Sequence, residues 1–342
     1  MKRLGIGMIG LGMAVKPHAL ALRDLTDKAE FVGAYSPTPS RRQEFTRAYG
    51  LPVVESLDAL LGDSRVDIVI ILTPPRTHAE LAIQAARAGK HVLLEKPIDI
   101  TLEKARAVVA AVEGEGMKLG VVFQQRFRSG ATTLRRLLAQ GALGDLLSVS
   151  CVVRWWRSAE YYAQPGRGML ERDGGGVLLT QAIHALDVML DLAGPAQRVS
   201  AICRTSPLRS IETEDIACAA LEFRNGAVGV IDATTTAYPG YPERIELAGT
   251  LGSALLEAER LTLQRHGEAS VQVDGSSAGG GGADPMAFSH EPHRRLIEDF
   301  FDAVRTGREP RTSGRSALAV HALIDAMLAS SRAGMAVDVV PT

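Results

Sequence analysis

The sequence predicts an α/β protein of two domains, in which a doubly wound parallel sheet precedes an α+β domain with a mainly antiparallel sheet. Three observations support this class. Short apolar runs alternate with helical patterns over the first third of the chain, hairpin-like pairs of runs follow after about residue 124, and 342 residues suit two cores better than one. We therefore expect domains at residues 1–123 and 124–342.

Five strands are predicted in the first domain by short apolar runs, at Leu4–Ile9, Phe31–Tyr35, Asp67–Leu72, His91–Leu94 and Leu119–Phe123. One helix face is predicted between the third and fourth strands by Ala79, Ala82, Ile83 and Ala86. Gly89 is expected to end that helix. Strands that alternate with helices indicate a parallel sheet with helices on both faces.

The second domain has a different pattern. Two strand-like runs within Ala217–Ala237 are joined by Asn225-Gly226, which favours a hairpin because both residues tolerate a positive φ. Arg244–Ala258 adds a second pair around a glycine-rich turn. The composition of Asp274–Pro285 predicts a flexible loop, either a lid or a plain connector. Apolar stripes predict two final helices, on Leu296, Phe300 and Val304 and on Leu318, Ala322, Leu323 and Ala326.

The amino-acid composition limits the classes of partner that the protein is expected to bind. With 46% hydrophobic and 23% charged residues and a net charge of −1, the chain is typical of a soluble globular protein and shows no preference for nucleic acid or an anionic membrane. No stretch beyond the apolar start approaches the roughly 18 residues of a membrane span. The three scattered cysteines offer neither a disulfide framework nor metal-ligand spacing, so we expect a cytoplasmic protein without a metal.

A glycine loop follows the first strand. Gly10 and Gly12 stand where a dinucleotide site needs a sharp turn and a close approach of backbone N–H groups to a pyrophosphate at a helix N-terminus. Val15 replaces the third small residue of that motif. The alternative is a tight turn without a ligand.

The end of the second strand bears on the choice of cofactor. Ser36 stands where an acidic residue would bind the ribose hydroxyls of NAD, and Arg41 and Arg42 follow it. A small hydroxyl leaves room for a 2′-phosphate, and a guanidinium matches a phosphate, so NADP is favoured over NAD. Alternatively, both arginines are solvated residues of the next helix.

Two further segments lie at strand ends, where ligands of doubly wound sheets bind. In Leu72–His78, Thr77 is expected to cap a helix, and the loop is expected to contact the cofactor through Thr73, Pro74, Pro75 and His78, with a plain capping turn as the alternative. Lys96 ends the segment HVLLEK, where partial burial would lower its pKa and let it exchange a proton with a hydroxyl or carbonyl.

Five segments together resemble the Gfo/Idh/MocA family of pyridine-nucleotide oxidoreductases, which includes glucose–fructose oxidoreductase and inositol dehydrogenase. They are GMIGLGMA, ILTPPRTHAELAIQAARAGKHVLLEKP, FQQRF, DGGGVLLTQAIHALD and ELAGTLGSALLE, and they span the chain nearly from end to end. The resemblance implies a Rossmann dinucleotide-binding domain and a second domain whose open antiparallel sheet forms a homodimer or homotetramer contact. It implies that Lys96 is the active-site lysine and adds Met13, Ala14, Glu95 and Gln125 as cofactor contacts.

The resemblance also implies a histidine partner. His184 matches the family histidine that relays the substrate proton, and Thr180, His184 and Asp187 at i, i+4 and i+7 are expected to share one helix face. Many members have an aspartate where Thr180 stands, so a complete Lys-Asp-His triad is in doubt. Asp187 either orients the imidazole or is a helix-surface or interdomain salt-bridge residue.

An aromatic and basic segment precedes that helix. Its rings would stack on a sugar or cyclic substrate and its guanidinium groups would bind carboxylates or phosphates. The substrate candidates are Arg154, Trp156, Arg157, Tyr161, Tyr162 and Arg167, with subunit packing as the alternative. Arg126 is a further candidate, or else a structural salt bridge.

Together these features predict an NAD(P)-dependent dehydrogenase that moves hydride between nicotinamide C4 and a hydroxyl or carbonyl carbon of a sugar, polyol or cyclic diol, with Lys96, His184 and Thr180 as the catalytic group. Two alternatives stay open. One uses tightly bound NAD for transient oxidation during elimination or glycoside cleavage. The other is a regulatory protein that senses NAD(P) without turnover.

Overall fold

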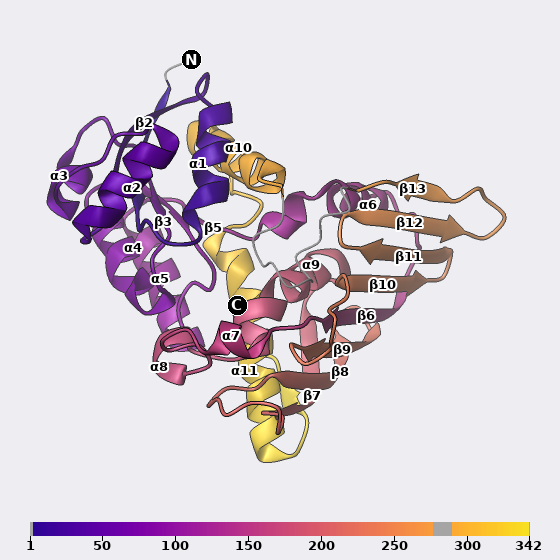
Figure 1. Cartoon of the computed structure of the whole chain (residues 1–342). Coiled ribbons are helices and arrows are strands. Elements are labelled where there is room, and N and C mark those ends of the chain that lie inside the picture. Colours follow the sequence, from indigo (N-terminus) through magenta and orange to yellow (C-terminus); the bar gives the residue numbers. More distant parts are fainter. Residues whose placement is uncertain (1–2, 276–288, 342) are drawn as a thin grey trace. The chain divides into compact units, whose positions relative to one another are not determined.

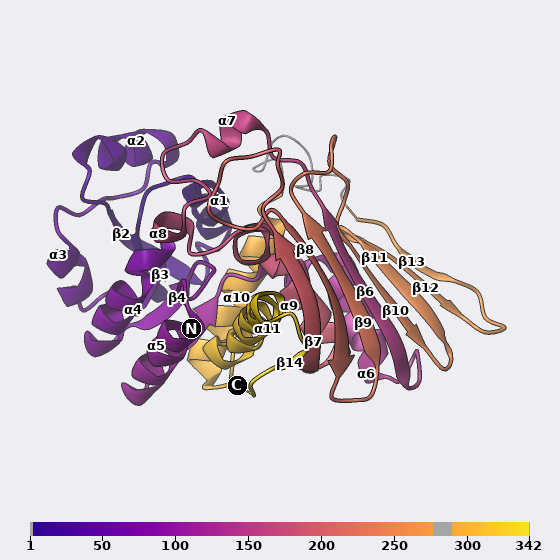
Figure 2. The same cartoon turned by 90° about the horizontal axis from the view of Figure 1, so that it is seen from below.

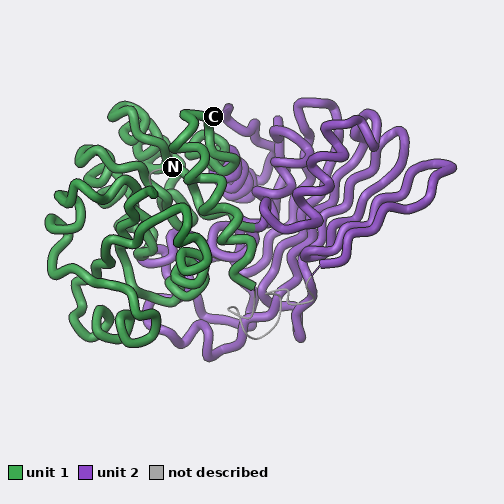
Figure 3. Tube along the Cα trace, turned by 90° about the horizontal axis from the view of Figure 1, so that it is seen from above, with its two compact units in different colours: residues 1–124, 289–318 green, residues 125–288, 319–342 purple. Residues whose placement is uncertain are grey.

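The computed structural model describes residues 3–275 and 289–341. The chain divides into two compact units (Figure 3): unit 1 holds the residues up to Gln124 together with Ser289–Leu318, and unit 2 holds Gln125–Phe288 and Ala319–Thr342. The loop predicted at Asp274–Pro285 lies almost entirely outside the described residues.

The predicted boundary after residue 123 is one residue from the first division, but assigning everything after it to the second domain is wrong for residues 289–318. Helix α10 (Glu291–Thr306) packs on α1 (Val15–Asp24) within unit 1. The contact includes the rings of His18 and His293, whose centroids lie 5.2 Å apart, and an ion pair between Lys28 and Glu298. The segment therefore completes the first hydrophobic core from a distant part of the sequence.

Unit 1 contains a five-stranded parallel sheet in the order β2-β1-β3-β4-β5. Its strands are β1 (Leu4–Ile9), β2 (Ala29–Tyr35), β3 (Ile68–Ile71), β4 (His91–Leu94) and β5 (Leu119–Val121). All five predicted strands are present, and β1 and β4 have the expected bounds. Buried β-branched and leucine side chains fill β3 and β4, as in a sheet covered on both faces.

Helices connect the parallel strands. They are α1, α2 (Pro39–Tyr49), α3 (Leu57–Gly62), the 3₁₀ turn η1 (Pro75–Thr77), α4 (His78–Arg87) and α5 (Leu102–Gly114). Helix α1 packs with α10 on one face of the sheet, and α4 packs with α5 on the other (Figure 1). The predicted helix is α4, and Gly89 follows it with φ +71°. The carboxyl ends of β1, β3 and β4 consequently lie side by side at one edge.

Unit 2 is built on a nine-stranded sheet in the order β13-β12-β11-β10-β6-β9-β8-β7-β14 (Figure 2). Only the β6–β9 pair is parallel among these described strands. The strands are β6 (Leu146–Arg154), β7 (Ala196–Arg204), β8 (Ile216–Phe223), β9 (Val228–Thr234), β10 (Arg244–Gly249), β11 (Gly252–Glu257), β12 (Arg260–Arg265), β13 (Val271–Val273) and β14 (Val337–Asp338). Both predicted hairpins are confirmed, as β8–β9 and β10–β11, with Gly226 at φ +88°.

Helices cover one face of this sheet. The helical elements described in this unit are η2 (Gln124–Phe127), α6 (Ser129–Ala139), α7 (Ala159–Tyr162), α8 (Leu170–Asp173), the π turn η3 (Leu178–Ala182), α9 (Ile183–Ala193) and α11 (Gly314–Ala333), which begins in unit 1. Helices α6 and α9 pack on the central strands. Along β8 and β9 burial alternates residue by residue, so the opposite face is open and exposes Val228 and Val230.

One segment contradicts the expectation that no stretch beyond the apolar start is long and apolar enough to span a membrane. Leu170–Ala193 is long and apolar enough to cross a membrane, with mean hydropathy 1.4 over its most apolar stretch. However, 78% of that stretch is buried inside the protein, where α9 lies against β6 and β10. The segment is thus the core helix of unit 2.

Candidate active site

The glycine loop of unit 1 has room for a ligand. Gly10 has φ +97°, and a Cβ there would stand 2.8 Å from the Leu72 carbonyl carbon, so only glycine fits. A Cβ added at Gly12 would meet nothing within 4 Å. The neighbouring Met13 is 62% exposed, and Ala14 begins helix α1 without a side-chain cap. The open space at a helix N-terminus leaves room for a dinucleotide pyrophosphate, and the contact of these four residues with the cofactor stays a prediction.

The two arginines after β2 differ. Arg42 donates to the Ser36 carbonyl oxygen (2.7 Å) and to Glu55 (2.8 Å), so its guanidinium is held by the protein. Arg41 is exposed in the first turn of α2 and has no hydrogen-bond or ion-pair partner among the described residues. Ser36 is buried, 2% exposed. Of the two, Arg41 is the one available to a ligand.

The loop after β3 is braced internally. Thr77 occupies the N-cap position of α4, but its hydroxyl bonds to Thr73 Oγ1 and donates to the Pro74 carbonyl, both at 2.8 Å, so the predicted side-chain cap is wrong. His78 is fully buried, and its two ring nitrogens lie 2.8 Å from the carbonyl oxygens of Thr73 and Pro97. Burial lowers the pKa of His78 against the opposing effect of these carbonyls.

His78 therefore ties the loop after β3 to the loop after β4, and its predicted direct contact with the cofactor is not supported. Thr73, Pro74 and Pro75 do lie at the carboxyl edge of the sheet, which leaves their predicted role open. A neutral imidazole has one N–H, so only one of its two carbonyl contacts is an N–H···O hydrogen bond.

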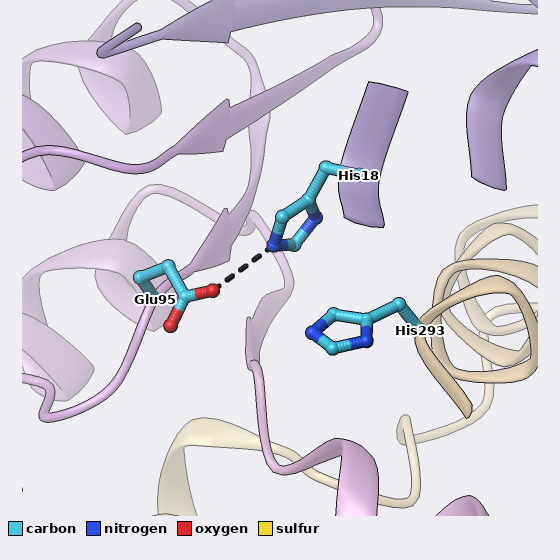
Figure 4. A group of neighbouring side chains, drawn as sticks. All are labelled: His18, Glu95 and His293. Atoms are coloured by element: carbon cyan, nitrogen blue, oxygen red, sulfur yellow. Dashed lines mark hydrogen bonds and ion pairs between the residues drawn. The ribbon is translucent and has the colours of Figure 1, made fainter. Parts of the chain in front are cut away.

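Lys96 follows β4 at the same edge, beside the mostly buried carboxylate of Glu95. Glu95 accepts a hydrogen bond from the Lys96 backbone N–H (3.1 Å), and its other oxygen lies 3.0 Å from His18 Nε2 (Figure 4). The Glu95 side chain is 15% exposed and makes these two internal contacts, and its contact with the cofactor stays a prediction.

In unit 2, the helix that carries His184 starts irregularly. The π turn Leu178–Ala182 precedes α9, so the predicted spacing of one α-helical face does not hold across Thr180 and His184. The Thr180 hydroxyl bonds to the Gly176 carbonyl (2.6 Å) and to Gln181. His184 is 9% exposed in the first turn of α9.

Arg126 and Asp187 form a buried ion pair, with Arg126 Nε 2.6 Å from Asp187 and Arg126 Nη1 3.1 Å from Asp191. Burial raises the pKa of Asp187 to about 6 although Arg126 opposes it, so the carboxyl is ionised at neutral pH. The structural salt-bridge alternative is the correct one for Arg126. Asp187 was expected either to orient the imidazole or to be a helix-surface or interdomain salt-bridge residue, but it is 1% exposed and its partner Arg126 lies in the same unit. Gln125 is buried and donates to Glu243 (3.4 Å), and its contact with the cofactor stays a prediction.

The aromatic segment forms a compact cluster of rings and guanidinium groups. Arg157 lies 5.1 Å from the Trp155 ring centroid and 5.6 Å from that of Tyr161. Tyr161 also contacts Arg167 at 4.9 Å. Its hydroxyl accepts from Gln181 (3.2 Å), which connects the cluster to Thr180. Most of the predicted substrate residues are therefore brought together.

Two sets of residues modify the predicted cluster. Arg154 does not belong to it, because this half-exposed side chain pairs with Asp232 on the open face of the sheet. Arg209 was missed: it contacts the rings of Tyr162 (4.6 Å) and Trp156 (5.5 Å) and pairs with Asp215 (2.9 Å). No motif surrounds Arg209, whereas Trp155 and Gln181, also missed, lay within segments already singled out.

A dinucleotide fold with an open glycine loop and a lysine at the adjacent strand end defines a nicotinamide-dependent oxidoreductase. A family profile described as "Oxidoreductase family, NAD-binding Rossmann fold" matches residues 4–123, and the Gfo/Idh/MocA C-terminal domain matches residues 131–255. The chain belongs to the Gfo/Idh/MocA family of oxidoreductases, and the predicted NAD(H)-binding dehydrogenase class is confirmed.

Relatives match over nearly the whole chain. Inositol 2-dehydrogenase of Rhizobium meliloti (strain 1021) is 29% identical over 95% of this chain and 96% of its own. The WlbA dehydrogenase from Bordetella pertussis, solved with NADH and UDP-GlcNAcA, is 30% identical with a TM-score of 0.85, covering 100% of both chains. A levoglucosan dehydrogenase solved with NADH is 26% identical with a TM-score of 0.89, again over 100% of both chains.

Proposed function

We propose that this dehydrogenase oxidises a secondary hydroxyl of a sugar, sugar derivative or cyclic polyol, or reduces the corresponding ketone, with Lys96 and His184 as the acid–base groups. When bound, the nicotinamide accepts or returns the hydride. In the oxidation direction the C–H bond gives up hydride, the O–H bond gives up its proton to the lysine–histidine pair, and a carbonyl remains. Lys96 also stabilises the negative charge that develops on that oxygen.

The observation that carries this function is the position of Lys96 directly after β4, at the strand edge that also contains the open glycine loop. In sheets of this kind the cofactor lies at the carboxyl ends of the strands. A cation there is well placed to act on a substrate oxygen. A protein that only senses NAD(P) needs no such proton-transfer group.

The Lys96→Ala enzyme tests the proposal, with Lys104→Ala on the first turn of α5 as the matched control. Turnover of a sugar or polyol substrate should fall about 10²-fold or more in K96A, the usual effect of losing an acid–base group, while the Kd for the cofactor stays within about twofold. The control should match the wild type. Unchanged turnover in K96A would remove Lys96 from the mechanism.

The substrate class is supported by the ring and guanidinium cluster and by the relatives, which are named for inositol and levoglucosan or were solved with UDP-GlcNAcA. Aromatic faces stack on sugar rings, and guanidinium groups bind acidic substituents. Thr180 is a neutral hydroxyl already bonded to Gly176 and Gln181. It can orient a substrate oxygen, and a full carboxylate-containing triad is not part of the proposal.

We further propose that NADP is the preferred cofactor. Arg41 is exposed and unpaired among the described residues, and Ser36 leaves no carboxylate to repel a 2′-phosphate. The ratio of kcat/KM for NADP to that for NAD measures the preference. It should exceed one in the wild type and fall about tenfold in Arg41→Ala, as expected from losing one charge-assisted hydrogen bond, whereas Arg47→Ala on the same helix should leave it unchanged. A wild-type preference for NAD would contradict this proposal.

A homodimer or homotetramer through the open face of the nine-stranded sheet is also proposed. Ile202 (62%), Val228 (56%) and Val230 (52%) are exposed on this face, which is apolar enough to favour association. A groove of about 630 Å³ on the same unit is lined by Arg154, Tyr238, Tyr241 and Arg244 among others. Light scattering on the purified protein would establish the number of subunits.

A cytoplasmic location stays a proposal as well. Cys151, Cys203 and Cys218 are all free, and none is arranged to form a disulfide with another. Free thiols persist in a reducing compartment. Cell fractionation of the native producer would test it.

A further inference from the structure

Two buried histidines in unit 1 have no part in the proposed reaction. His18 lies on α1 and His293 on α10, 0% and 3% exposed, and their rings meet edge to face with centroids 5.2 Å apart. Figure 4 shows both rings on the same side of the Glu95 carboxylate. One donor or acceptor atom from each of the three side chains lies within 4.8 Å of the others.

The two oxygens of Glu95 make different contacts. One lies 3.0 Å from His18 Nε2, and the other accepts the backbone N–H of Lys96 at 3.1 Å. Burial acts to raise the pKa of Glu95, but the hydrogen bond and charge of His18, followed by the charges of Lys96 and His293, outweigh it and hold the pKa below its usual range. An ionised carboxylate only accepts, so His18 Nε2 must carry the hydrogen.

The helices that carry the histidines are held together independently of this cluster. Asp24 on α1 pairs with His290 (2.7 Å), and Lys28 just after α1 pairs with Glu298. The two imidazoles thus belong to a rigid pair of helices. Glu95 connects this pair of helices to the main chain of the active-site segment, since its second oxygen accepts a hydrogen bond from the Lys96 N–H.

We propose that His18 and His293 are positioning residues, which act through the Glu95 carboxylate to fix the backbone of Lys96 and so the reach of its amine. The inference rests on the proposed function of Lys96. A misplacement of about 1 Å at a reacting group can lower a rate about 10²-fold. Loss of either histidine should therefore lower kcat more than it weakens the binding of substrate or cofactor. The proposal also gives a positioning role in catalysis to the segment 289–318, which carries His293.

The first test compares His18→Leu with His18→Gln. Leucine removes the N–H donor, whereas the glutamine amide can present one near the position of Nε2. We expect kcat to fall about tenfold to 10²-fold in H18L and to recover most of that loss in H18Q, with KM and cofactor Kd within about twofold in both. His91→Leu, at the opposite end of β4, is the control and should keep its kcat.

A purely structural role predicts otherwise: H18L and H18Q would lose activity in parallel with their folded fraction, and this result would overturn the proposal. If H18L does not fold, His293→Leu carries the same comparison with His293→Gln. Purified enzyme that contains one equivalent of transition metal, lost in H293L, would also overturn it, because the cluster would then be a metal centre.

A double variant separates this inference from the function on which it rests. If Lys96→Ala retains turnover, the proposed function fails irrespective of His18. If K96A loses turnover, adding H18L should lower the residual rate by less than about twofold, because both changes remove the same contribution. A further full tenfold loss in the double variant would show that His18 acts independently of Lys96.

Discussion

Replacing Asp187 by asparagine tests whether Arg126 supports the helix of His184 or serves the substrate. Arg126 and Asp187 are 5% and 1% exposed, and Arg126 contacts Asp187 through Nε and Nη2 and Asp191 through Nη1. Breaking a buried pair costs about 3–5 kcal/mol, because a charge is left without its partner. Asp191 would still neutralise part of the guanidinium charge, so D187N should lose about 3 kcal/mol, the lower end of that range.

Tryptophan fluorescence is a specific assay, because the chain's 2 tryptophans, Trp155 and Trp156, both lie in unit 2. Urea unfolding followed by this signal should show the loss in D187N. The double variant Arg126→Met with Asp187→Leu should recover to within about 1 kcal/mol of the wild type, since no buried charge remains. Arg265→Met, which removes an exposed ion pair of unit 2, should cost less than about 1 kcal/mol.

Two results would refute the reasoning. A D187N protein as stable as the wild type would show that the pair does not hold α9 in place. A well-folded double variant with a KM raised tenfold or more would show that Arg126 contributes to substrate binding. The expected outcome is a KM close to that of the wild type.

Four other substitutions have defined outcomes. Gly10→Ala should destabilise unit 1 by about 1–3 kcal/mol in thermal unfolding, because φ at this position is +97° and the added Cβ would clash with Leu72. Gly12→Val should leave the stability unchanged and raise the cofactor Kd at least tenfold. Burial lowers the pKa of His321 from 6.5 to about 4, so protonation of this imidazole should reduce the free energy of unfolding by about 3 kcal/mol as the pH falls from 6.5 to 4. His321→Leu should abolish this contribution to the pH dependence in urea titrations. Val230→Asp on the open sheet face should reduce the subunit number in light scattering.

Much of the fold could be predicted because it depends on local patterns. The bounds of β1 and β4 follow from continuous apolar runs, and the β8–β9 hairpin follows from Asn225-Gly226. Strand β7 was missed because its alternating pattern includes two arginines and a serine on the open face, so no apolar run marks it. The place of α10 in unit 1 was missed because it depends on contacts between residues about 270 positions apart, such as Lys28 and Glu298.

The candidate site divides in the same way. Glycines and strand ends indicated where a dinucleotide would bind, since their role follows from backbone geometry. The partners of charged side chains could not be predicted, because Arg126 and Asp187 are 61 residues apart and become neighbours only in the folded core. A single histidine on an amphipathic helix resembles an ordinary core residue, so His18 gave no signal before Glu95 was placed beside it.

The segments that carry the two proposed acid–base groups are fixed by the same chemical means. In unit 2, the Glu214 carboxylate accepts the backbone N–H groups of Gly176 and Leu178, both at 3.1 Å, at the start of the helical segment that continues to His184. In unit 1, Glu95 accepts the Lys96 N–H. A charge-assisted bond to the main chain fixes a backbone more firmly than a neutral one.

The two carboxylates differ in their surroundings, and this difference predicts how each responds to acid. Burial raises the pKa of Glu214, and its backbone donors only partly oppose the effect, whereas His18 and Lys96 reverse it for Glu95. As pH falls, Glu214 should therefore be protonated first and release the start of the His184 helix while Lys96 is still held. Hydrogen exchange at Gly176 and Leu178 should accelerate at a higher pH than exchange at Lys96, and the reverse order would contradict this account.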